Sequence, residues 1–164
     1  MDSCFLTNYR PSAAQCGVMS RSSSMYDQFF RQHKIAPHMR KEFVSLWSGW
    51  LGSVRIHELD EVTENEWSRF NDFVSLVATE YEAFLPNHEE RELIPVEKPG
   101  TLAQSYSHAM NKSASDFLQL VVPVLDCVIE ESWDYTYIIW HQGDESISEL
   151  SPLIGRVGLF HFSS

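Results

Sequence analysis

The chain has 164 residues, of which 43% are hydrophobic and 13% aromatic, and this is enough apolar material for one sizeable core. Asp and Glu number 23 against 12 Lys and Arg, which gives a net charge of -11. Such a chain repels nucleic acid and anionic lipid, so direct binding to either is disfavoured, whereas a basic protein would be attracted.

The three cysteines are Cys4, Cys16 and Cys127, and they include no C-x-x-C pair. An odd number without such a pair favours neither a disulfide framework nor a thiolate metal site. The first residues hold no apolar run typical of a signal peptide, and no segment approaches the roughly 20 apolar residues of a membrane-spanning helix. We therefore expect a cytoplasmic protein.

Residues 1–24 end in the small polar run MSRSSSM, which is typical of a linker or tail. We expect a single folded domain over residues 25–164. Within it, MYDQFFRQHK predicts a short helix. A longer helix is predicted over residues 37–51, because Met39, Phe43, Trp47 and Trp50 recur at helical spacing between Pro37 and Gly52.

The strongest helical signal begins at Thr63, which forms a capping-box pattern with Glu66. Apolar residues then repeat at helical spacing as far as Phe84, just before Pro86, and a stripe of this kind is typical of core packing. Residues 86–112 predict a long loop or a short edge strand at ELIPVE. Ser113 and Asp116 predict another helix, which runs to residue 121 before Pro123.

Beyond Pro123 the apolar pattern becomes alternating, which predicts two strands joined as a hairpin around Ser132 and Trp133. Asp144 then indicates the start of a helix that ends near Gly158, and LFHF predicts a last strand. The C-terminal half thus predicts helix, strand, strand, helix and strand. The expected fold class is α+β, with N-terminal helices packed on one face of a small, mainly antiparallel C-terminal sheet.

The common catalytic signatures are absent from the sequence, including a nucleophile elbow, a phosphate loop, a dinucleotide fingerprint and a zinc-binding helix. The histidines in HELDE and HEERE have no second histidine at ligand spacing, so we predict no metal and no cofactor. Cys127 is expected on the apolar face of its strand, where a buried thiol is inert.

The stretch CVIEESWDYTYIIWHQGDE combines acids with aromatic residues, which is the composition of surfaces that bind basic partners. We predict a non-enzymatic acidic protein that blocks a basic protein, as an immunity or inhibitor protein neutralises a toxin domain. Its carboxylates would pair with cations around the partner's active site while aromatic side chains fill the cleft. The predicted binding residues are Glu130, Glu131, Trp133, Asp134, Tyr135, Asp144 and Glu145.

Two alternatives use other features of the same half of the chain. The first is an enzyme acting on a small substrate, with Glu131, Asp134 and His141 as acid and base groups. It would show a concave pocket with carboxylates at the hairpin, whereas a blocking protein would display them on a flat or convex face. The second is a structural or assembly subunit, such as a homodimer formed through the edge strand LFHF.

Overall fold

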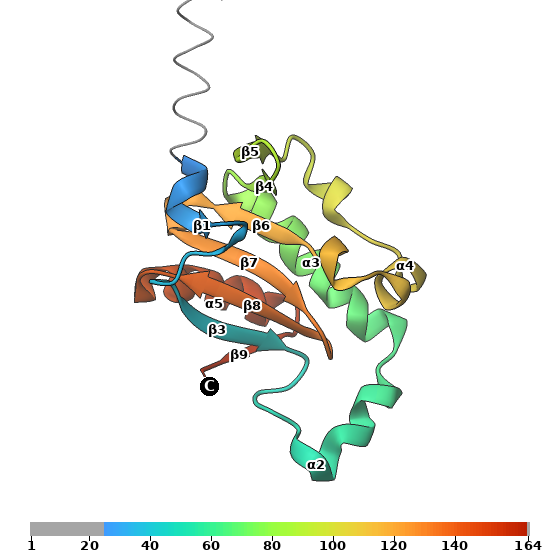
Figure 1. The fold of residues 1–164 in the computed structure, drawn as a ribbon. Coiled ribbons are helices and arrows are strands. Elements are labelled where there is room, and N and C mark those ends of the chain that lie inside the picture. Colours follow the sequence, from blue (N-terminus) through green and yellow to red (C-terminus); the bar gives the residue numbers. More distant parts are fainter. Residues whose placement is uncertain (1–24, 164) are drawn as a thin grey trace, which may run out of the picture.

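The computed structural model describes residues 25–163, so the tail expected over residues 1–24 lies outside the described residues. The fold is α+β, as predicted, and is built on a seven-stranded sheet of order β5-β4-β6-β7-β8-β3-β9 (Figure 1). Every neighbouring pair of strands in this sheet is antiparallel. A separate two-stranded hairpin, β1-β2, lies near the start of the described chain.

The strands are β1 (Phe30–Arg31), β2 (Lys34–Ile35), β3 (Arg40–Ser45), β4 (Phe84–Asn87), β5 (Glu92–Pro95), β6 (Gln119–Val122), β7 (Cys127–Ser132), β8 (Thr136–His141) and β9 (Phe160–Phe162). The α-helices are α2 (Gly52–Arg55), α3 (Glu64–Glu80), α4 (Tyr106–Asn111) and α5 (Asp144–Arg156), and residues 25–29 are also helical. Four 3-10 turns, Ile56–Glu61, Pro99–Leu102, Ala114–Asp116 and Pro123–Leu125, connect these elements.

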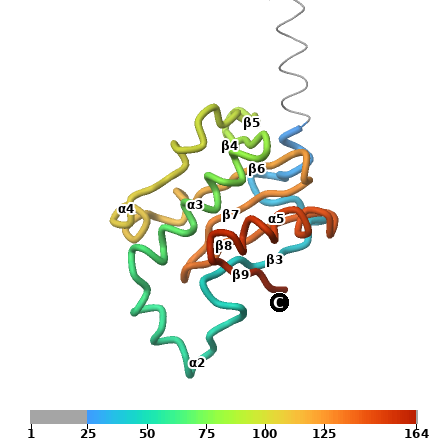
Figure 2. Tube along the Cα trace, turned by 180° about the vertical axis from the view of Figure 1, so that it is seen from behind, coloured from blue at the N-terminus to red at the C-terminus, as the bar shows by residue number. Residues whose placement is uncertain are grey.

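Helices α3 and α5 cover one face of the sheet, as the view from behind shows (Figure 2). The predicted capping box starts α3, because Thr63 and Glu66 each bond the other's backbone N–H. The apolar stripe of α3 is buried against the sheet, with Phe70 stacked on Tyr137 of β8 at 5.0 Å between ring centroids. The main core therefore lies between α3, α5 and the central strands.

The opposite face of the sheet is covered at one end by residues 25–39, which bury Tyr26, Phe29 and Phe30. A line of hydrogen bonds crosses the sheet beneath this segment. The hydroxyl of Tyr26 lies 2.6 Å from Nδ1 of His88, and Nε2 of His88 lies 2.9 Å from Oε1 of Gln119. Gln119 and Trp140 then both donate to Glu130, each at 2.7 Å. These bonds attach the N-terminal segment to His88, which follows β4, and continue from there across β6, β7 and β8.

The helix predicted over residues 37–51 is wrong, because residues 40–45 form strand β3 between β8 and β9. The apolar side chains of this segment lie on both faces of the sheet and do not form a single stripe. Val44 enters the core under the helices, whereas Phe43 lies on the other face beside Trp50 and Phe162. A short apolar run satisfies both helical and strand spacing, and here the backbone bonds to two strands decide the outcome.

The helix predicted from Ser113 to residue 121 is also wrong beyond its first turn. Only Ala114–Asp116 is helical, and the chain continues into β6 between β4 and β7. Leu120 packs under the helices and Val121 packs under the N-terminal segment, so β6 is buried on both faces. Burial on both faces produces a continuous apolar run, which periodicity cannot distinguish from a helix.

Other predicted elements are confirmed with shifted ends. The strand expected at ELIPVE is β5, at one edge of the sheet, and LFHF contains β9, at the other edge. The helix begun by Thr63 ends at Glu80, so that Phe84 belongs to β4. The hairpin expected around Ser132 and Trp133 is β7-β8, followed by α5 and the positive φ of Gly158. None of the described helices is long and apolar enough to cross a membrane.

After Ser45 the chain leaves the sheet and returns only at α3. Residues 46–62 form an arm that projects beyond the end of the sheet and carries α2 and the 3-10 turn Ile56–Glu61 (Figure 1). Gly52, which was expected to end a helix, begins α2 with a positive φ of 63° that favours glycine. The arm places its side chains next to the turn of the β7-β8 hairpin.

Candidate protein-binding surface

The turn of the β7-β8 hairpin lies at the end of the sheet from which the arm projects. Ser132 pairs with Thr136, Thr136 with Ser45, and Ser45 with Phe160, so four strands end in one row there. The turn consists of Trp133, Asp134 and Tyr135. Asp134 and Tyr135 have φ values of 57° and 52°, and aspartate is one of the few residues that accept this left-handed conformation readily. The turn holds Trp133 outward, with 60% of its surface exposed.

Two hollows flank this turn, one on each face of the sheet. The hollow on the helix side has a volume of about 210 Å³ and the hollow beside the arm about 160 Å³. Asp134 and Thr136 line both of them. We call the first the hairpin pocket and the second the arm pocket. The hairpin end is thus an exposed ridge between two small concavities.

Glu131, a predicted binding residue, points inward and lines the hairpin pocket. Its Oε2 atom lies 2.5 Å from Nζ of Lys112, and the two side chains are only 9% and 1% exposed. The same oxygen accepts a hydrogen bond from the backbone N–H of Leu118 at 3.1 Å, and Lys112 also donates to Gln104 at 2.6 Å. Glu131 therefore holds the segment 104–118 against the sheet through this one carboxylate oxygen.

Glu130 lies on the opposite face of β7 and belongs to the line of hydrogen bonds beneath the N-terminal segment. Both of its carboxylate oxygens accept a bond from within the chain, from Gln119 and from Trp140. The sequence suggested an exposed acidic pair, but alternation along the strand sends Glu130 and Glu131 to different faces and both are engaged internally.

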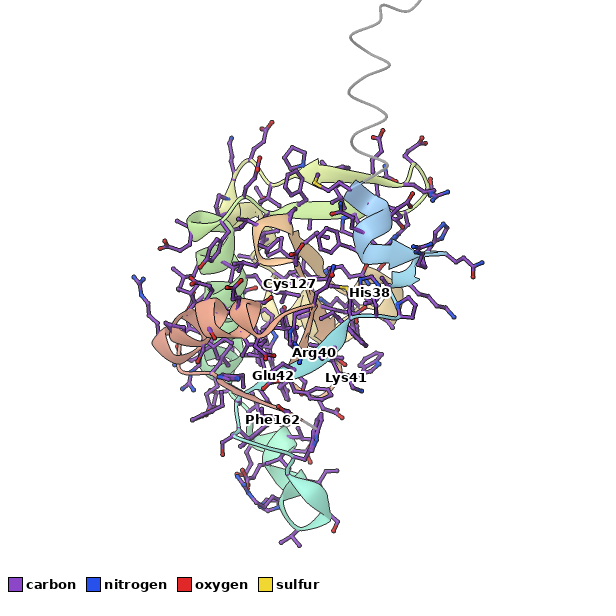
Figure 3. All side chains as sticks on the ribbon, turned by 90° about the vertical axis from the view of Figure 1, so that its left-hand side faces the viewer. His38, Arg40, Lys41, Glu42, Cys127 and Phe162 are labelled. Atoms are coloured by element: carbon purple, nitrogen blue, oxygen red, sulfur yellow. The ribbon has the colours of Figure 1, made fainter. Side chains whose placement is uncertain are left out.

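Asp144 and Glu145 lie away from the hairpin turn, because α5 begins after the other end of β8. The six residues of β8 separate the two places by roughly 17 Å at the usual rise of a strand. Asp144 forms an ion pair with Arg40 at 2.8 Å. Near it, Figure 3 shows His38, Arg40 and Lys41 along the beginning of β3 and the residues just before it. The predicted acids of α5 therefore adjoin the basic part of the chain.

The carboxylates near Tyr135 make the hairpin turn negatively charged. Burial raises the pKa of the Tyr135 hydroxyl to about 12, with further contributions from Tyr106 and from the charges of Asp60 and Asp134. Neither Asp60 nor Asp134 forms an ion pair with any residue in the range 25–163. These two carboxylates are available to a cation from outside.

Sequence reasoning missed the apolar residues that the arm brings to this surface. Trp50 and Ile56 line the arm pocket together with Asp134, and they are 59% and 60% exposed. Trp50 also packs edge-on against Phe43 and Phe162. The sequence placed Trp50 on the buried stripe of a helix, so the error in β3 concealed it. No local signal marks Ile56, because its exposure follows from the path of the arm.

Of the acid and base residues of the enzyme alternative, Glu131 and Asp134 line the same pocket, but His141 is not brought to it. Glu131 and Asp134 lie at the hairpin end, whereas His141 pairs with Cys127 at the other end of the two strands, and its Nδ1 atom lies 2.9 Å from the carbonyl oxygen of Gly143. Cys127 is buried, which raises the pKa of its thiol to about 12 and fits the expectation of an inert side chain. The described residues hold no group of three metal-ligating side chains.

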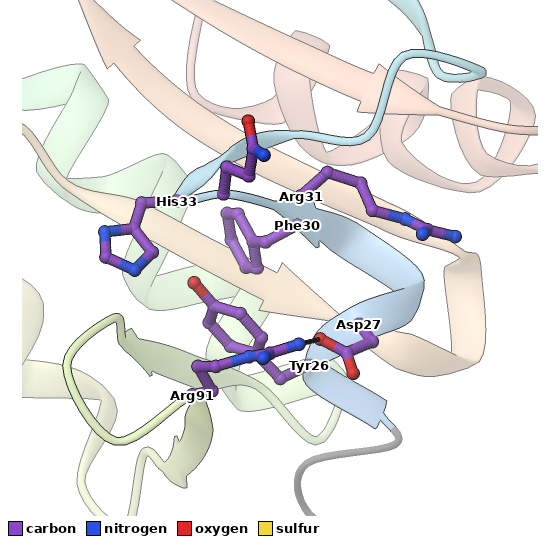
Figure 4. A pocket seen from close by; sticks show the side chains of 7 residues that line it. Tyr26, Asp27, Phe30, Arg31, His33 and Arg91 are labelled. Carbon is purple, nitrogen blue, oxygen red and sulfur yellow. Dashed lines mark hydrogen bonds and ion pairs between the residues drawn. The ribbon is translucent and has the colours of Figure 1, made fainter.

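A wider hollow of about 760 Å³ lies against the N-terminal segment, between Tyr26, Arg31, His33 and Arg91 (Figure 4). Three of its polar residues are engaged within the chain. Arg91 pairs with Asp27 at 2.6 Å, and Tyr26 bonds His88. The hairpin end is the better candidate because Trp50 and Trp133 are exposed there, and Asp60 and Asp134 form no ion pair within residues 25–163.

Comparisons of the chain with protein-family models, with curated proteins and with solved structures gave no match. The functional argument therefore rests on the geometry of the hairpin end.

Proposed function

We propose that this chain is a non-enzymatic acidic binding protein, and that a basic protein docks on the hairpin end. The observation that supports this most is the grouping of exposed Trp133, Trp50 and Ile56 with two carboxylates, Asp134 and Asp60, that have no cation beside them in residues 25–163. Exposed apolar groups with a charged rim are typical of protein-binding surfaces.

The two kinds of residue would make different contributions. Tryptophan offers a large, rigid contact area and is enriched among the residues that dominate binding energy. The carboxylates would attract a cationic partner and reject an acidic one, which affects association rate and specificity. Because a hollow lies on each side of the ridge, a partner would contact the ridge from both sides.

The proposed surface differs from the set expected from the sequence. It keeps Trp133, Asp134 and Tyr135 and adds Trp50, Ile56 and Asp60. Glu130 and Glu131 support it from inside, and Asp144 and Glu145 lie at the far end of β8. Blocking a toxin domain remains one specific form of this function, in which the turn enters a cation-rich cleft of a partner in the cytoplasm.

The test is to capture basic proteins from the source cells at low salt, and then to measure each purified partner against variants. Trp133→Ala should weaken binding by about 2 kcal/mol, mainly through faster dissociation. Asp134→Lys should mainly slow association, and this effect should shrink as salt is added.

Glu145→Lys is the matched control, because it reverses an exposed acid at the distant end of β8. It should change the association rate much less than Asp134→Lys. A partner whose binding responds to Glu145→Lys but not to Trp133→Ala or Asp134→Lys would place the docking surface elsewhere and contradict the proposal.

A further inference from the structure

The hairpin pocket is lined by six aromatic side chains, which are Trp67, Phe70, Phe117, Trp133, Tyr135 and Tyr137. They come from α3, from the segment before β6 and from the hairpin itself, so the pocket exists only in the folded chain. Phe117 and Trp133 meet edge-on with their ring centroids 4.7 Å apart. Aromatic faces attract cations through the quadrupole of the ring.

A carboxylate oxygen also reaches this pocket. Oε2 of Glu131 accepts all the hydrogen bonds that the structure gives this side chain, from Lys112, Leu118 and, at 3.5 Å, Gln104. Oε1 accepts none within residues 25–163. No buried side-chain oxygen or nitrogen among the described residues lacks a partner, so Oε1 is reached by solvent. The hairpin pocket is the cavity that Glu131 lines.

The net charge around the pocket is negative, which favours the binding of a cation. Lys112 and Glu131 neutralise one another at 2.5 Å, which leaves Asp134 at the rim and Asp60 beside Tyr135. Lys112 also shows that the neighbourhood tolerates a cation, since its Nζ atom lies over the ring of Phe117 at 5.5 Å from the centroid. Trp133 is exposed, so a second cation can approach its ring from outside.

The size of the pocket restricts what can enter it. Pockets for drug-sized ligands are typically about 300–1,000 Å³, whereas the hairpin pocket has about 210 Å³. This is suited to a single long side chain. Of the two basic side chains, the guanidinium is planar, weakly hydrated and able to stack on an aromatic ring while it donates to carboxylates. Ammonium groups keep their water more strongly.

We propose that the hairpin pocket receives the arginine side chain of a basic partner, stacked on Trp133 and bonded to Asp134 and to Oε1 of Glu131. This assignment depends on the proposed function, because it names the anchor by which the partner would be held. It does not require the partner to be known, since the side chain can be tested alone.

The probe is N-acetyl-arginine amide, titrated into the full chain and followed by the NMR signals of the tryptophan indole N–H groups. The indole signal of Trp133 should shift saturably, while that of Trp50 in the arm pocket should not. N-acetyl-citrulline amide, which has the same shape without charge, should give no saturable shift at the same concentrations. N-acetyl-lysine amide should bind more weakly than the arginine probe.

Variants locate the binding. Asp134→Asn should raise the Kd of the arginine probe about two- to fivefold, as expected for one partly exposed ion pair. Phe117→Leu should abolish the saturable shift, provided that its thermal unfolding shows a folded protein. Val124→Ser, on the exposed turn Pro123–Leu125 at the far end of β7, should leave the probe affinity unchanged.

An equal response to citrulline or to lysine amide would overturn the assignment, and so would an unmoved Trp133 signal at high arginine concentration. The two proposals can fail separately. If a basic partner binds and responds to Trp133→Ala but the arginine probe does not compete with it, the docking surface stands and the arginine pocket fails. If the probe binds but the hairpin variants do not change the binding of captured basic proteins, the arginine pocket stands and the docking surface fails.

Discussion

Lys112 and Glu131 show which contacts a buried ion pair needs in order to be stable. Removing two charges from water is costly, and their attraction repays the cost only when the geometry is good and the remaining polar atoms are bonded. Here Lys112 donates to Glu131 and Gln104, and Glu131 also accepts from the backbone of Leu118. Removing either residue would therefore leave the other charge buried without a counter-charge.

We predict that Glu131→Gln lowers the free energy of unfolding by about 3–5 kcal/mol, because it leaves the ammonium of Lys112 buried without a counter-charge. The double variant Lys112→Met/Glu131→Gln should recover much of this loss, since no buried charge remains. Urea unfolding of both variants measures the difference. The exposed pair Arg55 and Glu58 is the control, and Glu58→Gln should cost less than about 1 kcal/mol.

A loss below about 1 kcal/mol for Glu131→Gln would contradict this account, because it would mean that water solvates Lys112. The pair also shows why the binding residues could be predicted only in part. Alternation along β7 identified two acids, but the partner of Glu131 lies 19 residues earlier, in a stretch that the sequence left irregular. Whether a carboxylate is displayed or engaged depends on contacts of this kind.

Among the elements, α3 was predictable because its start is encoded locally. The hydroxyl of Thr63 accepts from the N–H of Glu66 at 3.2 Å, and the carboxylate of Glu66 accepts from the N–H of Thr63 at 3.0 Å. Both bonds join residues three apart, and the apolar repeat follows at once. Elements that are defined by neighbours in sequence can be recognised without knowing the fold.

Thr63→Ala should lower the free energy of unfolding by about 1 kcal/mol, because it removes an N-cap bond that no other side chain supplies. Thr79→Ala is the matched control in the same helix. Its hydroxyl bonds only the carbonyl oxygen of Ser75 in the preceding turn, so its loss should be close to zero. Urea midpoints of the two variants test this, and equal losses would show that the cap contributes nothing specific.

Strands β3 and β6 could not be recognised in the same way. Each lies inside the sheet, and its strand geometry is fixed by hydrogen bonds to neighbours distant in sequence, such as β8 and β9 for β3. Their short apolar runs matched helical spacing by coincidence. This error also concealed a candidate binding residue. A helix over residues 37–51 would bury Trp50, whereas the arm exposes it.

At the scale of the whole molecule, charge is arranged along the direction of the central strands. His38, Arg40 and Lys41 lie near the beginning of β3 (Figure 3). Asp60 and Asp134 lie at the hairpin turn, close to the end of β3. With a net charge of -11, the molecule attracts cations overall. The effect should weaken with salt.

The net charge and the buried acidic groups together set the response to alkali. Burial is the main cause that raises the pKa of Tyr26 and Tyr137 and raises that of Tyr135 to about 12. Burial also raises the pKa of the Cys127 thiol to about 12. In the unfolded chain, the thiol loses its proton near pH 8.5 and the tyrosines near pH 10. The folded state therefore binds more protons above these values.

Linkage then requires the stability supplied by these neutral groups to be complete below about pH 8.5 and to decline as the pH rises toward 12. Each proton lost also adds negative charge to a chain that already repels itself. Urea midpoints should thus be steady near neutral pH and fall steeply above about pH 10. Tyr137→Phe should reduce the steepness. Midpoints that stay constant above pH 10 would show that these rings are accessible to water.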